Sequence, residues 1–282
     1  MVKSFNSAYG KTMEVHEQKI KVACFGLQGF GNDLLSALNK YSHIEIVGLH
    51  TRESLFPFKY YSCSLIESLA EKMSVPVFYI PEKGEWECVS ADLAIISSFH
   101  RIFRKQHLLS YQFAINIHTA LLPSYKGATP TNWMIKNGEK IVGLSAHLMN
   151  EEIDSGSIIF QHKILNPYLC DDQLRQVLSF LSRDIVNEII NSYPRYKAIP
   201  VNDANINESY FPARSEASSL IKVEDLKNIE ELIFHIKAFT NYPMPKISIG
   251  TRVFVIDYRQ PTESVEIEVK NQQFRVMGYW LI

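Results

Sequence analysis

Short apolar runs that alternate with helix-length segments constrain the fold of this chain more than any other feature. The runs are Ile20–Phe25, Ile44–Leu49, Val75–Ile80, Leu93–Ser97 and Phe113–Ile117. Segments between them, such as Phe30–Asn39, place leucines at helical spacing. Strands that alternate with helices are typical of a parallel sheet covered by helices on both faces. We therefore expect an α/β, Rossmann-like fold with a mainly parallel sheet.

The second half of the chain departs from this alternation. Strand-like runs near Val142–Met149 and Ser157–Leu165 lack a long helix between them, so we expect them to extend the sheet in the opposite sense. Asp171–Tyr193 has one apolar stripe and is the strongest helix, with Asp171 or Asp172 as its cap. Val201–Ser219 is polar and predicts an extended linker.

The last 80 residues predict a smaller unit. A helix is expected at Asn228–Phe239, and alternating apolar residues follow at Val253–Tyr258, Val265–Val269 and Phe274–Trp280. These three segments predict a small antiparallel C-terminal appendage. We divide the chain into a mobile N-terminal arm (1–18), an α/β domain (19–200) and a linker, helix and β appendage (201–282).

Charge and composition exclude several classes of function. Lys and Arg number 29 against 30 Asp and Glu, and this balance does not predict a nucleic-acid partner. No apolar run approaches the ~18 residues of a membrane-spanning helix, and residues 1–18 lack the apolar core of a signal peptide. The four cysteines have no paired spacing, so we expect no metal site and no disulfide framework. We expect a cytoplasmic protein that binds no membrane.

The first strand ends in a glycine-rich turn, Gly26-x-x-Gly29-x-Gly31. This spacing differs from the G-x-G-x-x-G of dinucleotide-binding domains, and no acidic residue follows the second strand at His50-Thr51-Arg52. The sequence of this turn therefore argues against binding of NAD. Two interpretations remain: an anion site at a helix N-terminus, or glycines that serve a tight turn.

Polar residues gather at the end of the fifth predicted strand. Asn116 and His118 lie two residues apart, so their side chains point to one face of the sheet. The carboxyl ends of strands are where open α/β sheets place active sites. Asp154 lies in a predicted turn and has the chemistry to orient a histidine. Spacing alone leaves a second interpretation open, in which these residues have no catalytic role.

A wider pattern resembles the folate-dependent formyltransferases. Asn116-x-His118, Leu121-Leu122-Pro123 with Lys126-Gly127, and Asp154-x-Gly156 resemble the signature of that superfamily. Its members include glycinamide ribonucleotide formyltransferase, methionyl-tRNA formyltransferase and the nucleotide-sugar N-formyltransferases. Features that resemble the last two are Trp133, Asn137-Gly138-Glu139, Gly143, His147 and Tyr210-Phe211-Pro212-x-Arg214. The resemblance covers about residues 20–245, with departures at Thr119-Ala120 and Asn150-Glu151-Glu152.

The resemblance implies transfer of a formyl group from 10-formyltetrahydrofolate to an amine, with Asn116, His118 and Asp154 as catalytic residues. Such a transfer passes through a tetrahedral intermediate with an oxyanion, which hydrogen-bond donors from Asn116 and a protonated His118 would stabilise. The imidazole of His118 is also suited to remove a proton from the amine. We interpret His147 as a packed histidine rather than a catalytic one.

The resemblance also implies the residues that bind the two substrates. For the folate these are Phe99, Ile102, Phe103, Ile153 and Asp154. For the acceptor they are Lys126 and Arg214, which would meet a diphosphate, together with Trp133 and Tyr242. Each of these four also has an ordinary interpretation as a packed or surface residue.

The acceptor is predicted from charge and length. The segment Thr51–Ser62 holds only Arg52 and Lys59, which is few cations for binding a transfer RNA. The 37 residues after Pro245 are too few for a five-stranded barrel, since five strands need ~5 residues each plus loops. Among the acceptors that the resemblance implies, we therefore expect a nucleoside-diphosphate amino sugar, as in the nucleotide-sugar N-formyltransferases. Methionyl-tRNA, another small amine and a non-catalytic binding role stay open, as does a homodimer formed through the C-terminal strands.

Overall fold

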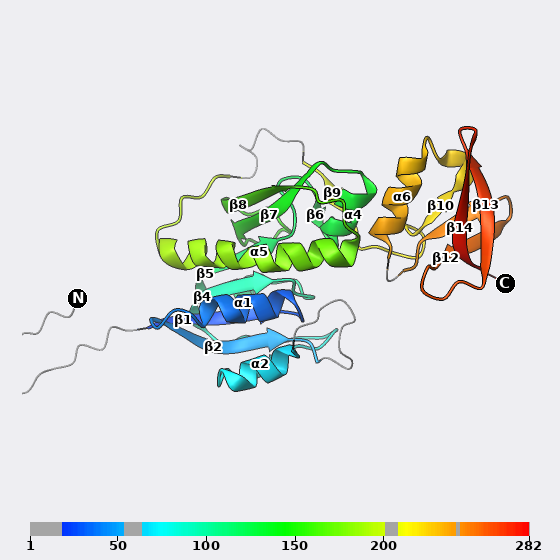
Figure 1. Ribbon diagram of the computed structural model, residues 1–282. Coiled ribbons are helices and arrows are strands. Elements are labelled where there is room, and N and C mark those ends of the chain that lie inside the picture. Colours follow the sequence, from blue (N-terminus) through cyan, green and yellow to red (C-terminus); the bar gives the residue numbers. More distant parts are fainter. Residues whose placement is uncertain (1–18, 54–63, 201–207, 241–242, 282) are drawn as a thin grey trace, which may run out of the picture.

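The computed structural model describes residues 19–53, 64–200, 208–240 and 243–281 (Figure 1). Its α/β part contains a seven-stranded sheet with the order β3-β2-β1-β4-β5-β7-β8. These strands are β1 (Ile20–Gly26), β2 (Ile44–Thr51), β3 (Val77–Tyr79), β4 (Ala91–Ser97), β5 (Tyr111–His118), β7 (Ile141–Leu148) and β8 (Ile158–Leu165). The predicted arm 1–18 lies outside the described residues.

The direction of the strands confirms the α/β prediction. β1, β2, β3, β4 and β5 are parallel to one another, and β7 pairs antiparallel with β5. β8 pairs antiparallel with β7, so it returns to the direction of the parallel strands. We expected both β7 and β8 to run opposite to the parallel strands. This is confirmed for β7 and wrong for β8.

The two faces of the sheet bury different cores because side chains alternate along each strand. Val22 and Cys24 of β1 pack in the larger cluster with α1 (Phe30–Leu38), α2 (Ile66–Lys72), α4 (Pro130–Lys136) and α5 (Asp171–Ser192). Ala23 and Phe25 face the other side, where an aromatic cluster lies beside the short helix α3 (Lys105–Leu108). The predicted helix Phe103–Ser110 is thus shorter than expected, since Phe103 turns into the aromatic cluster.

The longest helix, α5, buries the apolar stripe that the sequence predicts, including Leu174, Leu178, Ile185 and Ile189. Its cap differs from the prediction. The N-cap residue is Cys170, and Asp171 stands in the first turn, where its carboxylate accepts hydrogen bonds from Thr131 and Arg214. The carboxylate of Asp171 therefore ties α5 to α4 and to the chain near residue 214.

The C-terminal part is a five-stranded sheet in the order β10-β11-β12-β14-β13, and this corrects one prediction. Its strands are β10 (Leu220–Lys222), β11 (Lys246–Ile249), β12 (Arg252–Ile256), β13 (Glu263–Val269) and β14 (Gln272–Trp280). The sequence predicted only β12, β13 and β14. The 37 residues after Pro245 hold four strands, and β10, which precedes Pro245, supplies the fifth. All pairs in this sheet except β10 with β11 are antiparallel.

Helix α6 (Ile229–Ala238) joins the two parts of the molecule (Figure 1). Leu232 belongs to the apolar core of the C-terminal sheet, while Ala238 and Phe239 belong to the core of the α/β part. The amide of Asn132 on α4 donates to the carbonyl oxygen of Ala238. The predicted helix Asn228–Phe239 is confirmed, with Asn228 as the N-cap that accepts from the N–H of Glu231.

Two strands beside the main sheets involve the predicted linker. β9 (Tyr210–Phe211) pairs in parallel with β6 (Lys126–Gly127), which belongs to the loop after β5. Residues 201–207 of the linker lie outside the described residues. The described part of the linker therefore packs against the α/β domain.

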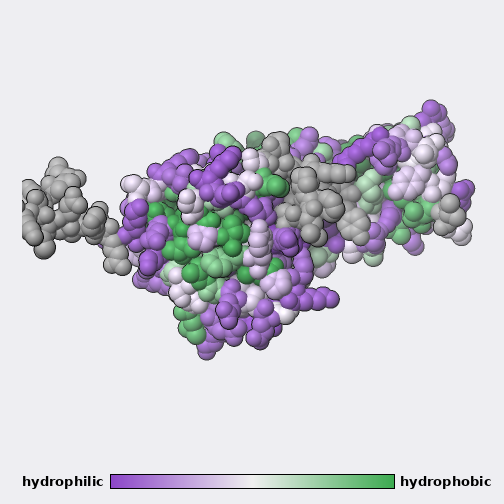
Figure 2. Space-filling model, turned by 90° about the horizontal axis from the view of Figure 1, so that it is seen from below, coloured by the Kyte–Doolittle hydropathy of each residue, from purple (hydrophilic) through white to green (hydrophobic). Residues whose placement is uncertain are grey.

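Figure 2 shows one face of the molecule, on which hydrophobic side chains gather over the α/β part, whereas the C-terminal end is mixed. No helix among the described residues is both long enough and apolar enough to span a membrane.

Candidate active site

Asn116 and His118 stand at the carboxyl end of β5, next to the central strand β4 of the seven-stranded sheet. β5 separates the parallel strands from the antiparallel pair β7 and β8. His118 is 6% exposed, and both residues line the same cavity. The sequence therefore placed these two side chains on one face correctly.

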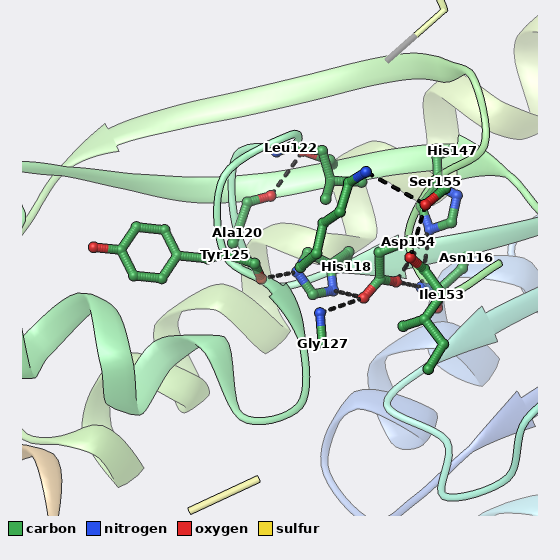
Figure 3. Close-up of polar contacts among 12 residues, drawn as sticks. Asn116, His118, Ala120, Leu122, Tyr125, Gly127, His147, Ile153, Asp154 and Ser155 are labelled. Atoms are coloured by element: carbon green, nitrogen blue, oxygen red, sulfur yellow. Dashed lines mark hydrogen bonds and ion pairs between the residues drawn. The ribbon is translucent and has the colours of Figure 1, made fainter. Parts of the chain in front are cut away.

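Asp154 reaches this strand end from the turn between β7 and β8 (Figure 3). The turn lies against the end of β7 because position 156 is glycine: a Cβ there would be 1.6 Å from the carbonyl oxygen of Leu148. Asp154 itself has a φ of 51°, in the left-handed region that aspartate tolerates better than most residues. The Asp-x-Gly sequence thus lets the carboxylate approach β5.

His118 is held between a backbone carbonyl and the Asp154 carboxylate. Its Nε2 lies 2.8 Å from the carbonyl oxygen of Tyr125, and its Nδ1 lies 3.5 Å from Oδ2 of Asp154. Since a carbonyl oxygen only accepts hydrogen bonds, Nε2 carries the proton of the neutral ring. Burial lowers the pKa of His118 below 6.5, although Asp154 and the Tyr125 carbonyl oppose this shift. The ring is therefore a neutral base at physiological pH.

The two oxygens of Asp154 have separate partners. Oδ2 accepts from the backbone N–H of Gly127 at 2.9 Å, and Oδ1 accepts from Nδ2 of Asn116 at 3.2 Å. Oδ1 is also 3.5 Å from Nε2 of His147. Burial alone would raise the pKa of Asp154, but His118, His147 and the Gly127 N–H outweigh it and lower the pKa to about 2. The carboxylate is ionised throughout the physiological range.

A cavity of about 490 Å³ opens above these residues. It is lined by Asn116, His118 and Asp154 and by all four other residues that we expected to contact the folate: Phe99, Ile102, Phe103 and Ile153. Ile102 is 63% exposed and Ile153 43% exposed. Exposed apolar side chains beside an active-site cavity are suited to cover a flat ring system. Their role as folate contacts stays a prediction.

Three of the four predicted acceptor-binding residues, Lys126, Trp133 and Arg214, are not part of the lining of this cavity. Lys126 is buried, with Nζ 2.6 Å from Glu208, and Arg214 pairs with Asp171. The indole N–H of Trp133 donates to the carbonyl oxygen of Pro212. Tyr242 lies outside the described residues. The acceptor contacts assigned to all four residues stay predictions, and for Lys126, Trp133 and Arg214 the cavity lining gives no support.

Sequence reasoning missed other residues of the cavity, among them Phe30, Thr129, Met149 and Arg175. Arg175 projects from α5, and its guanidinium lies 5.9 Å from the centre of the Phe30 ring. Its position in the strong helix Asp171–Tyr193 was visible in the sequence, but the meeting of α5 with the start of α1 was not. Arg175 brings a positive charge to the part of the cavity near the glycine turn.

The glycine-rich turn after β1 serves backbone geometry. Gly29 has a φ of 93°, and its N–H is bonded to the side chain of Asn32. A Cβ on Gly26 would be 2.7 Å from the Cα of Gly31. The backbone N–H of Gly31 bonds to the carbonyl oxygen of Leu27. These contacts support the second interpretation of the turn, in which glycines allow close approach of the backbone.

Three non-glycine residues of the cavity lining have positive φ angles: Ser98 (61°), Thr129 (52°) and Asp154 (51°). For a β-branched residue such as Thr129 this conformation is unusual. Strained backbone of this kind clusters at functional sites. Within the described residues, no group of His, Cys, Asp and Glu is arranged to hold a metal ion.

Comparison with known proteins identifies the class of enzyme to which this site belongs. Residues 83–178, which include Asn116, His118 and Asp154, match the formyl transferase family. The chain therefore contains a formyl transferase domain, which supports a folate-dependent formyltransferase. The methionyl-tRNA formyltransferase of Helicobacter pylori strain P12 is 28% identical to it over 237 residues, which cover 79% of this chain and 75% of that protein. The resemblance inferred from the motifs is therefore confirmed.

Solved structures of other formyltransferases have the same fold. An N-formyltransferase from Helicobacter canadensis, in complex with folinic acid and dTDP-3-aminofucose, is 20% identical with a TM-score of 0.60, covering 93% of this formyltransferase and 100% of that chain. The methionyl-tRNA formyltransferase of Clostridium thermocellum is 13% identical, also with a TM-score of 0.60. The match covers 93% of this chain and 98% of that chain. The fold therefore does not distinguish between the two kinds of acceptor.

Proposed function

We propose that this enzyme transfers the formyl group of 10-formyltetrahydrofolate to the amine of an amino-deoxy sugar linked to a nucleoside diphosphate. The convergence of Asn116, His118 and Asp154 on one cavity is the observation that carries the formyl-transfer assignment. Phe99, Ile102, Phe103 and Ile153 would hold the folate, which supplies the formyl group when bound.

His118 acts as the base at its Nδ1 atom. Nε2 is occupied by the Tyr125 carbonyl, so Nδ1 receives the proton that the amine loses on attacking the formyl carbon. The cation that forms lies beside the ionised Asp154, whose Oδ2 is 3.5 Å from Nδ1. The same proton is then available for the nitrogen that leaves the formyl group. Asp154 thereby stabilises the charged form of His118, while the Tyr125 carbonyl orients the neutral ring.

The charge distribution favours a small anionic acceptor over a transfer RNA. Between Leu220 and Leu281, eight Lys and Arg offset eight Asp and Glu, so the C-terminal sheet offers no excess of positive charge. Arg175 of α5 contributes a cation to the cavity lining, which also includes Glu151 and Glu152 of the β7–β8 turn. One such cation suits a diphosphate group.

Methionyl-tRNA is the second candidate acceptor, and two observations favour it. The H. pylori relative that is 28% identical is a methionyl-tRNA formyltransferase. In addition, the C-terminal part has five strands, so the length of the tail no longer argues against such an enzyme. We place it second because binding a polyanion requires clustered cations.

The deciding experiment measures formyl transfer from 10-formyltetrahydrofolate to a panel of dTDP-linked amino-deoxy sugars and to charged initiator transfer RNA. We expect turnover on an amino sugar nucleotide, with a KM that changes little between low and moderate salt. Transfer RNA binding would instead weaken with a log–log slope of about −0.7 to −0.9 per phosphate contacted. Turnover on transfer RNA alone would refute the sugar acceptor.

A further inference from the structure

His147 lies directly opposite Asn116 on neighbouring antiparallel strands, and it is only 2% exposed. Side chains of directly opposed residues share one face of the sheet and touch. Nε2 of His147 is 3.1 Å from Nδ2 of Asn116 (Figure 3). Both residues line the cavity. The proposed function assigns no role to this histidine.

The hydrogen bonds around His147 fix which nitrogen carries its proton. Nδ1 lies 3.2 Å from the carbonyl oxygen of Leu148, which only accepts, so Nδ1 is the donor. Nε2 of the neutral ring then has a lone pair and accepts an N–H from Asn116. A proton on Nε2 would instead point at the N–H of that amide, which is nearer to Nε2 at 3.1 Å than Oδ1 of Asp154 at 3.5 Å.

The second N–H of Asn116 is also engaged, because Nδ2 donates to Oδ1 of Asp154 at 3.2 Å. A rotated amide would bring its oxygen toward the ionised carboxylate, and two acceptors repel each other. Among the residues that the structure describes, none donates a hydrogen bond to Oδ1 of Asn116. The amide therefore offers its oxygen, rather than its N–H groups, to a ligand.

We propose that His147 is a positioning residue that fixes the amide of Asn116 so that its Oδ1 accepts one N–H of the attacking amine. This rests on the proposed formyl transfer and changes the expected role of Asn116, since both of its N–H groups are used within the protein. The amine lone pair forms the new bond to the formyl carbon. Its other proton passes to Nδ1 of His118 and from there to the leaving nitrogen of the folate as the old carbon–nitrogen bond breaks.

The test combines two variants with a double-mutant comparison. Glutamine can place an acceptor oxygen near the position of Nε2, and leucine cannot. With 10-formyltetrahydrofolate and a dTDP-linked amino-deoxy sugar, His147→Leu should lower kcat by roughly 10- to 100-fold, with the KM for both substrates nearly unchanged. His147→Gln should retain most of kcat. In an Asn116→Ala background, His147→Leu should cost little more, because the two residues act as one unit.

Several results would overturn the proposal. One is a wild-type kcat in folded His147→Leu. Another is a kcat in His147→Gln that is as low as in His147→Leu. A third is that His147→Leu lowers kcat by the same factor in the Asn116→Ala background as in the wild type. Imidazole ¹⁵N spectra of the unliganded protein should show the proton of His147 on Nδ1, and a proton on Nε2 would refute the proposal even if the leucine variant does not fold. Absence of turnover by the wild type would refute the sugar acceptor, while these spectra would still test the position of Asn116.

Discussion

The carbonyl oxygen of Tyr125 lies 2.8 Å from Nε2 of His118, seven residues earlier in the chain. The loop after β5 therefore turns back onto the strand that carries His118, the proposed base. This bond leaves Nδ1 as the nitrogen that exchanges protons, and it keeps that nitrogen toward Asp154. A single backbone contact thus determines both the tautomer and the orientation of the proposed base.

Replacing His118 by Ala, or Asp154 by Asn, should lower kcat by about 10²–10⁴-fold, the usual contribution of a general base. The reason is that His118 receives the amine proton and Asp154 stabilises the resulting charge. Steady-state kinetics on variants with native circular dichroism checks this. The matched control is His162→Ala, a histidine on β8 that pairs with Glu188 outside the cavity lining. Near-normal rates in folded His118→Ala would contradict the mechanism.

The pH profile of kcat/KM should have its acid limb below pH 6.5. His118 must be neutral to accept a proton, and burial lowers its pKa, so activity is lost only when the pH falls below that of an ordinary histidine. Asp154, with a pKa of about 2, remains ionised across this limb. An acid limb well above pH 6.5 would show that His118 is not the titrating base.

Stability should fall as the pH drops from about 6.5 to 4. Burial lowers the pKa of His50 and of His235 to about 4 each. The unfolded chain then binds protons first as the pH falls, and this favours unfolding by up to about 3 kcal/mol per histidine at the end of the range. Denaturant unfolding at several pH values measures the loss. His50→Gln should flatten the dependence, and an unchanged slope would contradict it.

Replacing Gly156 by Ala should remove most activity. The added Cβ would meet the carbonyl oxygen of Leu148, so the turn that carries Asp154 must move away from β7. Overpacking of this kind typically costs about 1–3 kcal/mol of stability. Gly250→Ala is the control for destabilisation alone, since its φ of 58° makes alanine strained there while the Cβ meets open space. If Gly156→Ala kept normal kinetics, the contact would not position Asp154.

Replacing Arg175 by Ala should raise the KM for the amino sugar nucleotide by roughly tenfold or more, because a hydrogen bond to a charged group is worth about 1.5–3 kcal/mol. The KM for the folate co-substrate should stay unchanged. Arg183→Ala provides the control: it removes the same charge from the same helix, but Arg183 pairs with Asp33. An effect on the folate alone would assign this end of the cavity to the other substrate.

Much of the α/β part could be predicted, as could the residues Asn116, His118 and Asp154, because the sequence patterns that indicate them span only a few neighbouring residues. Apolar runs predicted the ends of the strands to within about three residues. That Asn116 and His118 share one face follows from the alternation of side chains along β5 alone. The role proposed for His147 could not be predicted, for the opposite reason. Its partner Asn116 is 31 residues away, and only the register between β5 and β7 brings the two together.

The C-terminal part shows a second limit of sequence patterns. β10 has three residues, Leu220–Lys222, which is too short to display an alternation. It is separated from β11 by α6, so its pairing is non-local. The apolar patterns therefore missed two strands, β10 and the four-residue β11. Likewise, the charges of Lys126 and Arg214 were visible, but their partners Glu208 and Asp171 were not.

The pairing of β9 with β6 has a consequence for any shortened form of this enzyme. The hydroxyl of Ser209, just before β9, accepts a hydrogen bond from the N–H of Tyr125, whose carbonyl holds His118. A fragment that ends at residue 200 would keep all seven strands of the main sheet but would lose the hydrogen bond between Ser209 and Tyr125. We therefore expect a minimal active fragment to extend through at least Phe211, so that sheet formation and competent catalysis are separable properties of the chain.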